Sequence, residues 1–576
     1  MEARFAKSAY WNFLIWGVCS SLGITVSTLV DAILVGNFVG SDGLAVANLA
    51  TPVFLAYSLI GLTVGVGANV LIGRRLGASD VADANRIFNA QVLTGAVVGL
   101  VCLVMAGLFR ESLYRFLGAR DALLPLAEQY LTVVFFSAPV FVLYHMISVS
   151  VRTDGDPRLA AIASAVVIVT NLSLDLLFMK GFGWGIVGAS ASLCIAESLG
   201  LVILLLHFCK QHALLRFRLS IPRPADVKSF VVNGFGVGSA FIFQAVVMLV
   251  FNKLLLLGGG ADGVMHVAIF GVIYTISMIP FAVFDGAGSA ISTVVSIFAG
   301  EMDGKSMMTV LRQGVKIVSL SGALMAVGFL LRAEDLVRFF GLTDPAALAT
   351  ASLALRIFSV SVLFTGINTV VTAFWQAIGR ARLACVMSVT RNFVLMLALG
   401  FALISQYQII GLSATYVWGE ILCLAGVLLV RLSKSSGAYV AKKYRPVSRI
   451  YEKYYPIQTE SITQVSADLE GLCEDWEVPP KQAFFINLTV EELILNILKF
   501  GLKDADQQHY LAIKLLENGG EYIIRIRDNV STYNPFDPDS DAGDAIDAAV
   551  IKMITEKTKY CDYQRKLIFN YLYLIV

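Results

Sequence analysis

Long apolar runs occupy most of the chain before residue 432. A helix needs about 20 mostly apolar residues to cross the hydrocarbon core of a bilayer. The runs therefore predict about twelve transmembrane helices. The expected spans are residues 10–37, 44–71, 88–108, 130–151, 159–180, 187–208, 229–257, 268–299, 314–331, 349–378, 383–404 and 410–432.

The pattern changes near residue 432, where Lys, Asp and Glu become frequent. Over the whole chain 57% of residues are hydrophobic and 15% are charged, whereas a soluble domain holds about 25% charged residues. We therefore expect an all-α polytopic membrane protein followed by a small α+β domain. The first apolar run is too long for the apolar core of a cleaved signal peptide, so it is interpreted as the first span.

Charge and cysteine usage narrow the classes of partner. The formal net charge is +2 and no basic stripe is present, so no nucleic-acid partner is expected. The eight cysteines are scattered, mostly in apolar runs, without a CxxC pair or metal-ligand spacing. They are interpreted as small core residues.

Lys and Arg are concentrated in one alternate set of loops, which includes Arg74, Arg75, Arg152 and Arg158. Basic loops stay on the cytoplasmic side of a membrane. An even number of spans puts both ends of the bundle on that side. We expect a multi-pass protein of the bacterial inner membrane with a cytoplasmic N-terminus and a cytoplasmic C-terminal domain.

The two halves of the apolar region resemble each other. GIVGASASLCIAE at 185–197 aligns with QIIGLSATYVWGE at 408–420. Two six-helix halves of the same orientation imply a parallel repeat about an axis along the membrane normal. We expect an N-lobe at 1–215, a C-lobe at 216–440 and the C-terminal domain at 441–576. A duplicated bundle favours a transporter that works by alternating access.

Few ionisable residues lie inside the expected spans, where each is costly. Asp31 lies in the first span and Asp175 in the fifth, with Asn171 one helical turn before Asp175. Two carboxylates and an amide can hold a proton or Na⁺ and so couple ion entry to substrate exit. Asp285, in the eighth span, is a further candidate. The alternative is that these side chains only bond neighbouring helices.

Three other charged residues have structural interpretations. Arg391, in the eleventh span, is expected either to pair with a carboxylate or to lie near the cytoplasmic surface. Glu197 and Glu420 recur at matching places in the repeat. That recurrence is compatible with a shared helix-packing contact.

The apolar region resembles the MATE family of multidrug and toxin extrusion transporters. The resemblance rests on an ordered set of segments and covers nearly all of residues 1–440. The segments are VDAILVGNFVGSDGLAVANLATPV at 30–53, LIGRRLGASDVADANRIF at 71–88, RTDGDPRL at 152–159, TNLSLDLL at 170–177 and GWGIVGASAS at 183–192.

This resemblance implies an N-lobe cation site at Asp31, Asn171 and Asp175, with a hydroxyl near Ser190 or Ser192. It also implies export of organic cations and amphipathic compounds by H⁺ or Na⁺ antiport, with no cofactor required for transport. The chain departs from the family pattern in its second half, because the seventh span has no acid and Asp285 matches no family position.

The tail predicts a helix over 488–501, two strands around Asn518-Gly519-Gly520, a helical stretch and a last strand near 565–575. It resembles the GHKL ATPase fold, and most closely the anti-sigma-factor serine kinases. The resemblance implies Glu492 as general base, Asn496 on Mg²⁺ and ATP phosphate, and Asp528 on adenine. Val530 replaces the glycine of the following loop, and the glycine-rich lid is reduced to Gly543. Backbone cradles phosphate where glycine allows close approach.

Three functions follow as hypotheses. The first is a cation-coupled exporter of amphipathic or cationic small molecules, with a tail that binds nucleotide or a cytoplasmic regulatory protein. The second is a flippase for a lipid-linked or amphipathic metabolite. The third is a membrane-tethered, kinase-like sensor.

Overall fold

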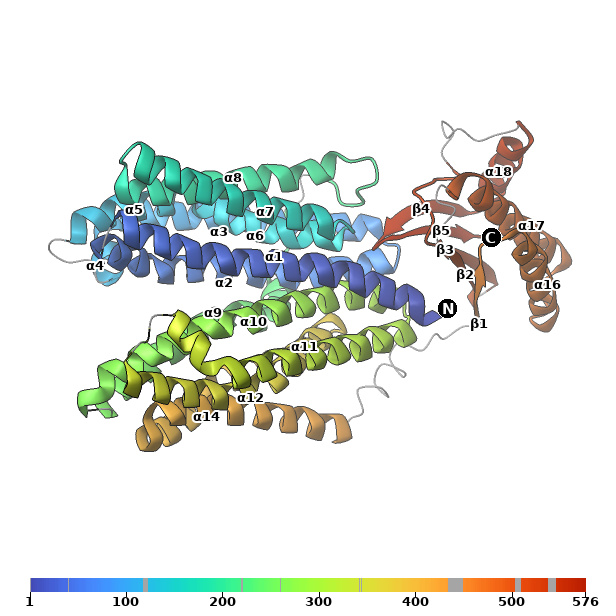
Figure 1. Ribbon diagram of the computed structural model, residues 1–576. Helices are drawn as coiled ribbons and strands as arrows, with labels where there is room; N and C mark the ends of the chain where they lie inside the picture. The colour runs from blue at the N-terminus through green and yellow to red at the C-terminus, as the bar shows by residue number, and fades with distance from the viewer. Residues whose placement is uncertain are drawn as a thin grey trace. The chain divides into compact units, whose positions relative to one another are not determined.

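A computed structural model describes the chain in two compact units (Figure 1). The first unit comprises residues 1–9, 211–214 and 443–576, and the second comprises 10–210 and 215–442. The structure describes residues 2–39, 41–117, 123–218, 221–258, 260–340, 342, 344–433, 449–502, 509–518, 520–536 and 545–576.

The second unit is a bundle of long helices, and Figure 1 shows them in two groups, blue to teal and green to orange. The first group contains α1 (Glu2–Phe38), α2 (Ser41–Gly77), α3 (Val81–Leu108), α4 (Arg110–Leu117), α5 (Leu124–Phe136), α6 (Ala138–Thr153), α7 (Pro157–Asp175), the π-helical η2 (Leu176–Gly181), α8 (Gly185–Leu205) and η3 (Leu206–Cys209).

The second group continues the chain through the green and orange helices. It contains α9 (Pro224–Gly258), η4 (Gly260–Asp262), α10 (Gly263–Gly300), α11 (Gly304–Phe339), α12 (Pro345–Ala377), α13 (Ala381–Val389), the π-helical η5 (Thr390–Val394) and α14 (Leu395–Ser433).

Ten helices among the described residues are long and apolar enough to cross a membrane, and the bent pair α5 and α6 makes an eleventh span. One of the ten, residues 381–429, has 49 residues. At 1.5 Å per residue it would extend about 73 Å, more than twice the hydrocarbon thickness.

That run turns back on itself at Gln408, which has a positive φ of 52°. A Cβ on Gly411 would lie 2.0 Å from the Leu403 carbonyl oxygen, and one on Gly419 would lie 2.5 Å from Met396 Cε. Residues so far apart on a straight helix could not meet. The run therefore holds two antiparallel spans, which gives twelve among the described residues, in agreement with the predicted number.

The internal repeat recurs in the backbone. Ser79 and Met302 have positive φ, and the next residue, Asp80 or Asp303, caps the following helix through its side chain. These pairs are separated by the same number of residues as Gly188 and Gly411. Each half also has a π-helical segment in its fifth span, which is η2 at the end of residues 157–181 and η5 within the run that begins at Ala381.

Small residues let the two groups of helices approach closely. A Cβ on Gly234 of α9 would lie 1.8 Å from the Thr63 carbonyl oxygen of α2. One on Gly300 of α10 would lie 2.0 Å from the Arg74 carbonyl oxygen of α2. Without a hydrophobic driving force between helices in lipid, close backbone packing of this kind holds them together.

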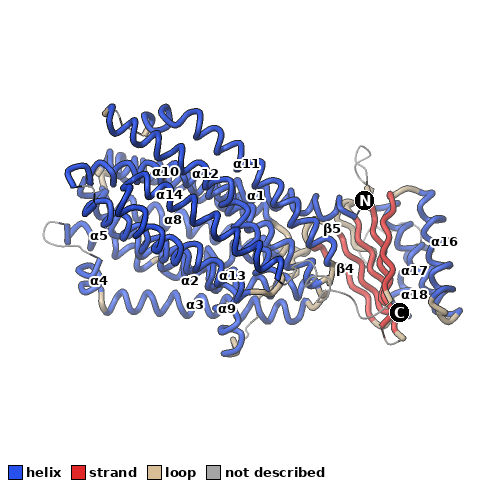
Figure 2. Tube along the Cα trace, turned by 90° about the horizontal axis from the view of Figure 1, so that it is seen from below, coloured by secondary structure: helices blue, strands red, loops and turns tan. Residues whose placement is uncertain are grey.

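The first unit contains an antiparallel five-stranded sheet in the order β1-β2-β3-β5-β4. Figure 2 shows its helices on one face of the strands. The elements are β1 (Ile450–Pro456), α16 (Thr459–Asp475), α17 (Pro480–Asn496), the π-helical η6 (Ile497–Gly501), β2 (Tyr510–Asn518), β3 (Glu521–Asp528), α18 (Ala545–Lys557), β4 (Tyr560–Lys566) and β5 (Phe569–Ile575).

The elements predicted for the C-terminal region can be compared with those of this sheet domain. The helix over 488–501 and the two strands before and after the Asn518-Gly519-Gly520 turn are confirmed as the end of α17 with η6, β2 and β3. The last strand near 565–575 is confirmed as β5, whereas β4 was not predicted; the chain reverses between the two strands with Leu567 at positive φ. Strand β1 and helix α16 carried no motif in the sequence analysis.

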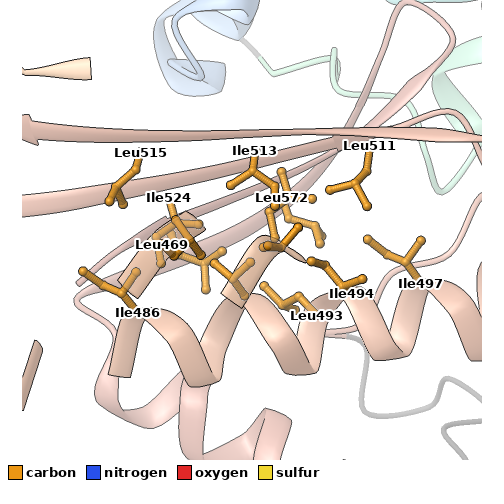
Figure 3. Packing of buried hydrophobic residues seen from close by; sticks show 14 of the residues in the cluster. Leu469, Ile486, Leu493, Ile494, Ile497, Leu511, Ile513, Leu515, Ile524 and Leu572 are labelled. Carbon is orange, nitrogen blue, oxygen red and sulfur yellow. The ribbon is translucent and has the colours of Figure 1, made fainter. Parts of the chain in front are cut away.

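Alternation along the strands divides the sheet into two faces. Leu511, Ile513, Ile524 and Leu572 face the helices and pack on Leu493 and neighbouring apolar residues in a buried core (Figure 3). The opposite face, which we call the open sheet face, consists of Tyr454, Ala512, Arg527, Phe569 and Tyr571, and it follows from the strand register.

The start of α1 belongs to the same unit and covers part of the open sheet face. Phe5 is 4% exposed, and its ring centroid lies 4.9 Å from that of Phe569 and 5.7 Å from that of Tyr454. The Arg527 guanidinium lies 5.0 Å from the Phe5 ring centroid. Aromatic and cation–π contacts thus join the chain's first turns to the sheet.

We expect Gly234→Ala to lower the melting temperature of the purified protein by several degrees, because the new Cβ meets the Thr63 backbone. Gly328→Ala is the matched control, since no atom lies within 4 Å of its Cβ position. There alanine should be neutral or favour the helix by up to about 1 kcal/mol. Equal melting temperatures for both variants would contradict the close-packing interpretation.

Candidate functional site

Asp31, Asn171 and Asp175 come together between α1 and α7. The Asn171 amide donates from Nδ2 to Asp31 Oδ1 at 2.8 Å and to Asp175 Oδ2 at 3.2 Å. The two carboxyl groups thus share one amide donor. The helical spacing of Asn171 and Asp175 puts both on the face that meets α1.

Of the two predicted hydroxyl groups, Ser192 joins this cluster and Ser190 does not. The Ser192 hydroxyl of α8 donates to Asp175 Oδ1. The Ser190 hydroxyl instead bonds the Val187 carbonyl oxygen of its own helix, at 3.1 Å. Directly after Asp175 the chain enters the π-helical η2, and such segments often occur at functional sites.

The charges of this cluster call for a cation or a proton. Two carboxyls that share one amide donor repel each other when both are ionised, and a bound cation or proton relieves that repulsion. Asn171 and Asp175 are each 2% exposed. Asn171 Oδ1 is buried without a hydrogen-bond partner. The cluster thus brings together two carboxylates and a hydroxyl, which are oxygen donors of the kind that hard cations prefer.

Asp285 lies in a different polar group. Its Oδ2 accepts from the Ser21 hydroxyl of α1 at 3.2 Å, and the Arg152 guanidinium of α6 attracts it electrostatically. Asp285 is exposed, although its neighbours Phe284 and Gly286 are buried. Its coupling role stays a prediction.

Arg391 forms a buried ion pair in the second group of helices, so the carboxylate-partner interpretation is confirmed. Its Nη2 lies 2.8 Å from Glu420 Oε1, and the two side chains are 12% and 6% exposed. Asn368 Nδ2 donates to Glu420 Oε2 at 2.6 Å, and Arg391 Nη1 donates to the Thr369 hydroxyl at 3.1 Å. Sequence reasoning had not identified Glu420 as the partner.

In the C-terminal sheet domain, Asn496 is already engaged by neighbouring groups. Its Nδ2 donates to the Glu492 carbonyl oxygen at 2.9 Å, and its Oδ1 accepts from the Tyr533 hydroxyl at 3.2 Å. The Tyr533 ring stacks on Phe500, with centroids 5.3 Å apart.

Asp528 is held by strand β5. Asn570 Nδ2 donates to Asp528 Oδ1 at 2.8 Å and also to the Val530 and Ser531 carbonyl oxygens. The Val530 N–H donates to the same carboxylate oxygen at 3.1 Å. The Val530 side chain is buried against Gly501, so the loop that follows β3 is closely packed on η6.

These contacts do not fit ATP with Mg²⁺ in the arrangement that the residues adopt. The Asn496 oxygen that would bind the metal accepts a tyrosine hydroxyl, and Val530 fills the place where a glycine would admit phosphate. Asn496 and the loop that follows Asp528 do lie together, as the resemblance implies. Gly543 lies outside the described residues.

The MatE family profile matches residues 18–177 and 239–402, which is more than half of the chain. The chain belongs to the MatE family. Asp31, Asn171 and Asp175 lie inside the first matched segment and Arg391 inside the second. Ser192 and the C-terminal sheet domain lie outside both.

Curated relatives of this MatE protein include the multidrug export protein MepA of Staphylococcus saprophyticus. It is 24% identical over 433 residues, which are 74% of this chain and 95% of the relative. MepA of Staphylococcus aureus strain MRSA252 is 25% identical over 424 residues, which are 72% of this chain and 92% of the relative.

Solved structures share the MatE fold of the bundle. One is the outward-facing conformation of a multidrug resistance MATE family transporter of the MOP superfamily, with a TM-score of 0.71 and 21% identity. It covers 76% of this chain and 97% of its own. A MOP superfamily transporter from Pyrococcus furiosus gives a TM-score of 0.69 and 23% identity, with 75% and 97% coverage.

We expect the stability of the C-terminal sheet domain to depend on the ionisation of Asp528. Burial raises its pKa to about 6, against the hydrogen bonds from Asn570 and Val530, which lower it. The unfolded carboxyl titrates near 3.9. The folded domain therefore holds a proton between about pH 4 and 6 that the unfolded chain has lost. Its free energy of unfolding should fall by up to about 3 kcal/mol as pH rises through that window.

Asp528→Asn should remove this fall, because asparagine cannot ionise. Pulsed thiol labelling of the buried Cys473 between pH 4 and 7, analysed by mass spectrometry, reports opening of the domain in the full chain. The exposed Asp475→Asn should keep the wild-type slope. If Asp528→Asn also keeps the wild-type slope, the pH dependence does not come from Asp528.

Proposed function

We propose that this MatE protein exports amphipathic or cationic small molecules in exchange for H⁺ or Na⁺. The observation that carries the proposal is the Asp31–Asn171–Asp175 cluster, in which two acids share one amide donor and their only other described polar partner is a hydroxyl. Export of several compounds rather than lipid flipping is favoured by the names of the MepA relatives.

Binding of the cation would act on the contact between α1 and α7. The two helices also meet where the Ser20 and Ser164 hydroxyls lie 2.8 Å apart, and where Ile168 packs on Gly23. Neutralising the acids removes their repulsion and the need for Asn171 to bridge them. The balance between two packings of α1 would then depend on the ion, which is what coupling requires.

Asp31→Asn and Asp175→Asn should each abolish gradient-driven transport, because an amide neither binds a proton nor carries the charge that holds Na⁺. The measurement is uptake of a fluorescent organic cation into proteoliposomes under an imposed H⁺ gradient and, separately, a Na⁺ gradient. Ser192→Ala, which removes one ligand, should weaken transport without abolishing it.

Asp335→Asn is the matched control, because this acid is 63% exposed in a surface ion pair with Arg332. It should transport like the wild type. If wild-type uptake responds to neither gradient, the antiport proposal is wrong and the flippase hypothesis becomes the better one.

We also propose that the C-terminal sheet domain regulates transport without hydrolysing ATP. Support comes from the engagement of Asn496 and Asp528 by the domain's own side chains. Phe5 gives the domain a route to the bundle, because it packs on Phe569 and lies on α1, the helix that carries Asp31. Nucleotide binding and a cytoplasmic partner protein remain the alternatives.

Phe5→Ala should change the transport rate by the same factor as Phe569→Ala, and the double variant should change it no further, because both remove one contact. Coupling between sites typically alters a rate or affinity by about fivefold or more. Trp11→Ala, on the exposed side of α1, is the control and should leave the rate unchanged. Wild-type rates in all four variants would refute regulation through this contact.

A further inference from the structure

Glu197 is a buried acid for which the proposed mechanism has no use. It lies in α8 (Gly185–Leu205), is 8% exposed, and its Oε2 is buried without a hydrogen-bond partner. It is separate from the Asp31 cluster, whose contact on α8 is Ser192. A lone acid at this depth must be neutralised by something.

The internal repeat shows how the equivalent acid is neutralised in the other half of the bundle. Glu420 occupies the equivalent place in the C-lobe, at the spacing that also relates Gly188 to Gly411. There Arg391 and Asn368 surround the carboxylate with charge-assisted hydrogen bonds. The same buried acid is thus kept in both lobes, but only the C-lobe provides a fixed cation.

Apolar and neutral groups stand where the N-lobe would need that cation. The position equivalent to Arg391, by the spacing that relates Gly155 to Gly379, is Val167. Val167 and the Tyr144 ring both lie at Gly200, less than one helical turn after Glu197. Valine cannot pair with a carboxylate, so the substitution removes the cation from this lobe.

The titratable groups on the helices around α8 have other partners. The Tyr144 hydroxyl of α6 faces Glu197 but lies 3.4 Å from the Ser164 hydroxyl of α7. Cys194, on α8 itself, contacts Ser137. Tyr130 of α5 lies near Cys194 and the Asp31 cluster.

The basic groups are directed elsewhere too. The Arg152 guanidinium of α6 donates to the hydroxyls of Ser20, Ser148 and Ser289. His207 of η3 pairs with Asp154 and Asp156 at the end of the bundle. Within the described residues, no cationic side chain is paired with Glu197.

These contacts leave a proton as the species that neutralises the Glu197 carboxylate at the lowest energetic cost. An unpaired carboxylate inside a membrane protein costs several kcal/mol. A hard cation would need several oxygen ligands, and the neighbouring oxygens of Tyr144 and Ser164 already bond each other. We propose that Glu197 is a proton-binding site of the N-lobe, separate from the Asp31 cluster and equivalent to the acid that Arg391 neutralises in the C-lobe. A role of this proton in transport rests on the antiport proposed above. The binding of the proton to Glu197 does not depend on that proposal.

Infrared spectroscopy of the reconstituted full chain tests the proton directly. A protonated carboxyl group has a C=O stretching band at a frequency where neither a carboxylate nor an amide absorbs. In an Asp31→Asn/Asp175→Asn background, Glu197→Gln should remove the band that remains from the membrane region, and Glu197→Asp should keep it at a shifted frequency. The matched control Arg391→Gln/Glu420→Gln should leave the band unchanged, since Glu420 forms an ion pair with Arg391. An unchanged band in Glu197→Gln overturns the proposal.

A second measurement separates this proposal from the antiport proposal. Protons released on addition of an organic cation are counted in weakly buffered solution for the wild type and for Glu197→Gln. Loss of part of the release in Glu197→Gln supports a transported proton. If the infrared band depends on Glu197 but the wild type shows no gradient-driven uptake, antiport fails and the proton site stands. If uptake is gradient-driven but the band is independent of Glu197, only the proton site fails.

Discussion

Hydrocarbon cannot solvate charge, and the acids inside this bundle are arranged around that constraint. Asp31 and Asp175 share the amide of Asn171, and the proposed antiport adds a cation or a proton to them. Glu420 is paired with Arg391. Among the described residues, no cationic side chain is paired with Glu197. A permanent partner fixes a structure, whereas a carboxyl without one can exchange a proton in the mechanism that we propose.

The internal repeat allows the acids of the two halves to be compared position by position. Both halves use the same helix order, the same capped turns at Asp80 and Asp303, and a π-helical segment in the fifth span. Close packing of α2 on α9 and α10 through glycines joins the halves. Hydrogen bonds such as those from Arg74 to the Ala377 carbonyl oxygen and from Ser21 to Asp285 add to this packing.

In the C-terminal sheet domain, the two residues expected to bind nucleotide are engaged by other side chains of the domain. Its helix and strands bring Asn496 close to the loop after Asp528, as the GHKL resemblance implies. Yet Tyr533 and Asn570 engage those two side chains, and Val530 packs where a glycine would leave space. Phe5 on the open sheet face suggests a different use, in which the domain holds the start of the helix that carries Asp31.

The sequence by itself determined the number of spans, the duplication, the strands β2 and β3, and the candidates Asp31, Asn171 and Asp175, because hydrophobic length and helical spacing are local properties. Tertiary structure alone decided that Ser192 rather than Ser190 reaches Asp175, that Gln408 divides the last helical run into two spans, and that Arg391 pairs with Glu420 while Glu197 has no such partner. These outcomes depend on which helix faces meet, and contacts between residues distant in sequence leave no periodic signal along the chain.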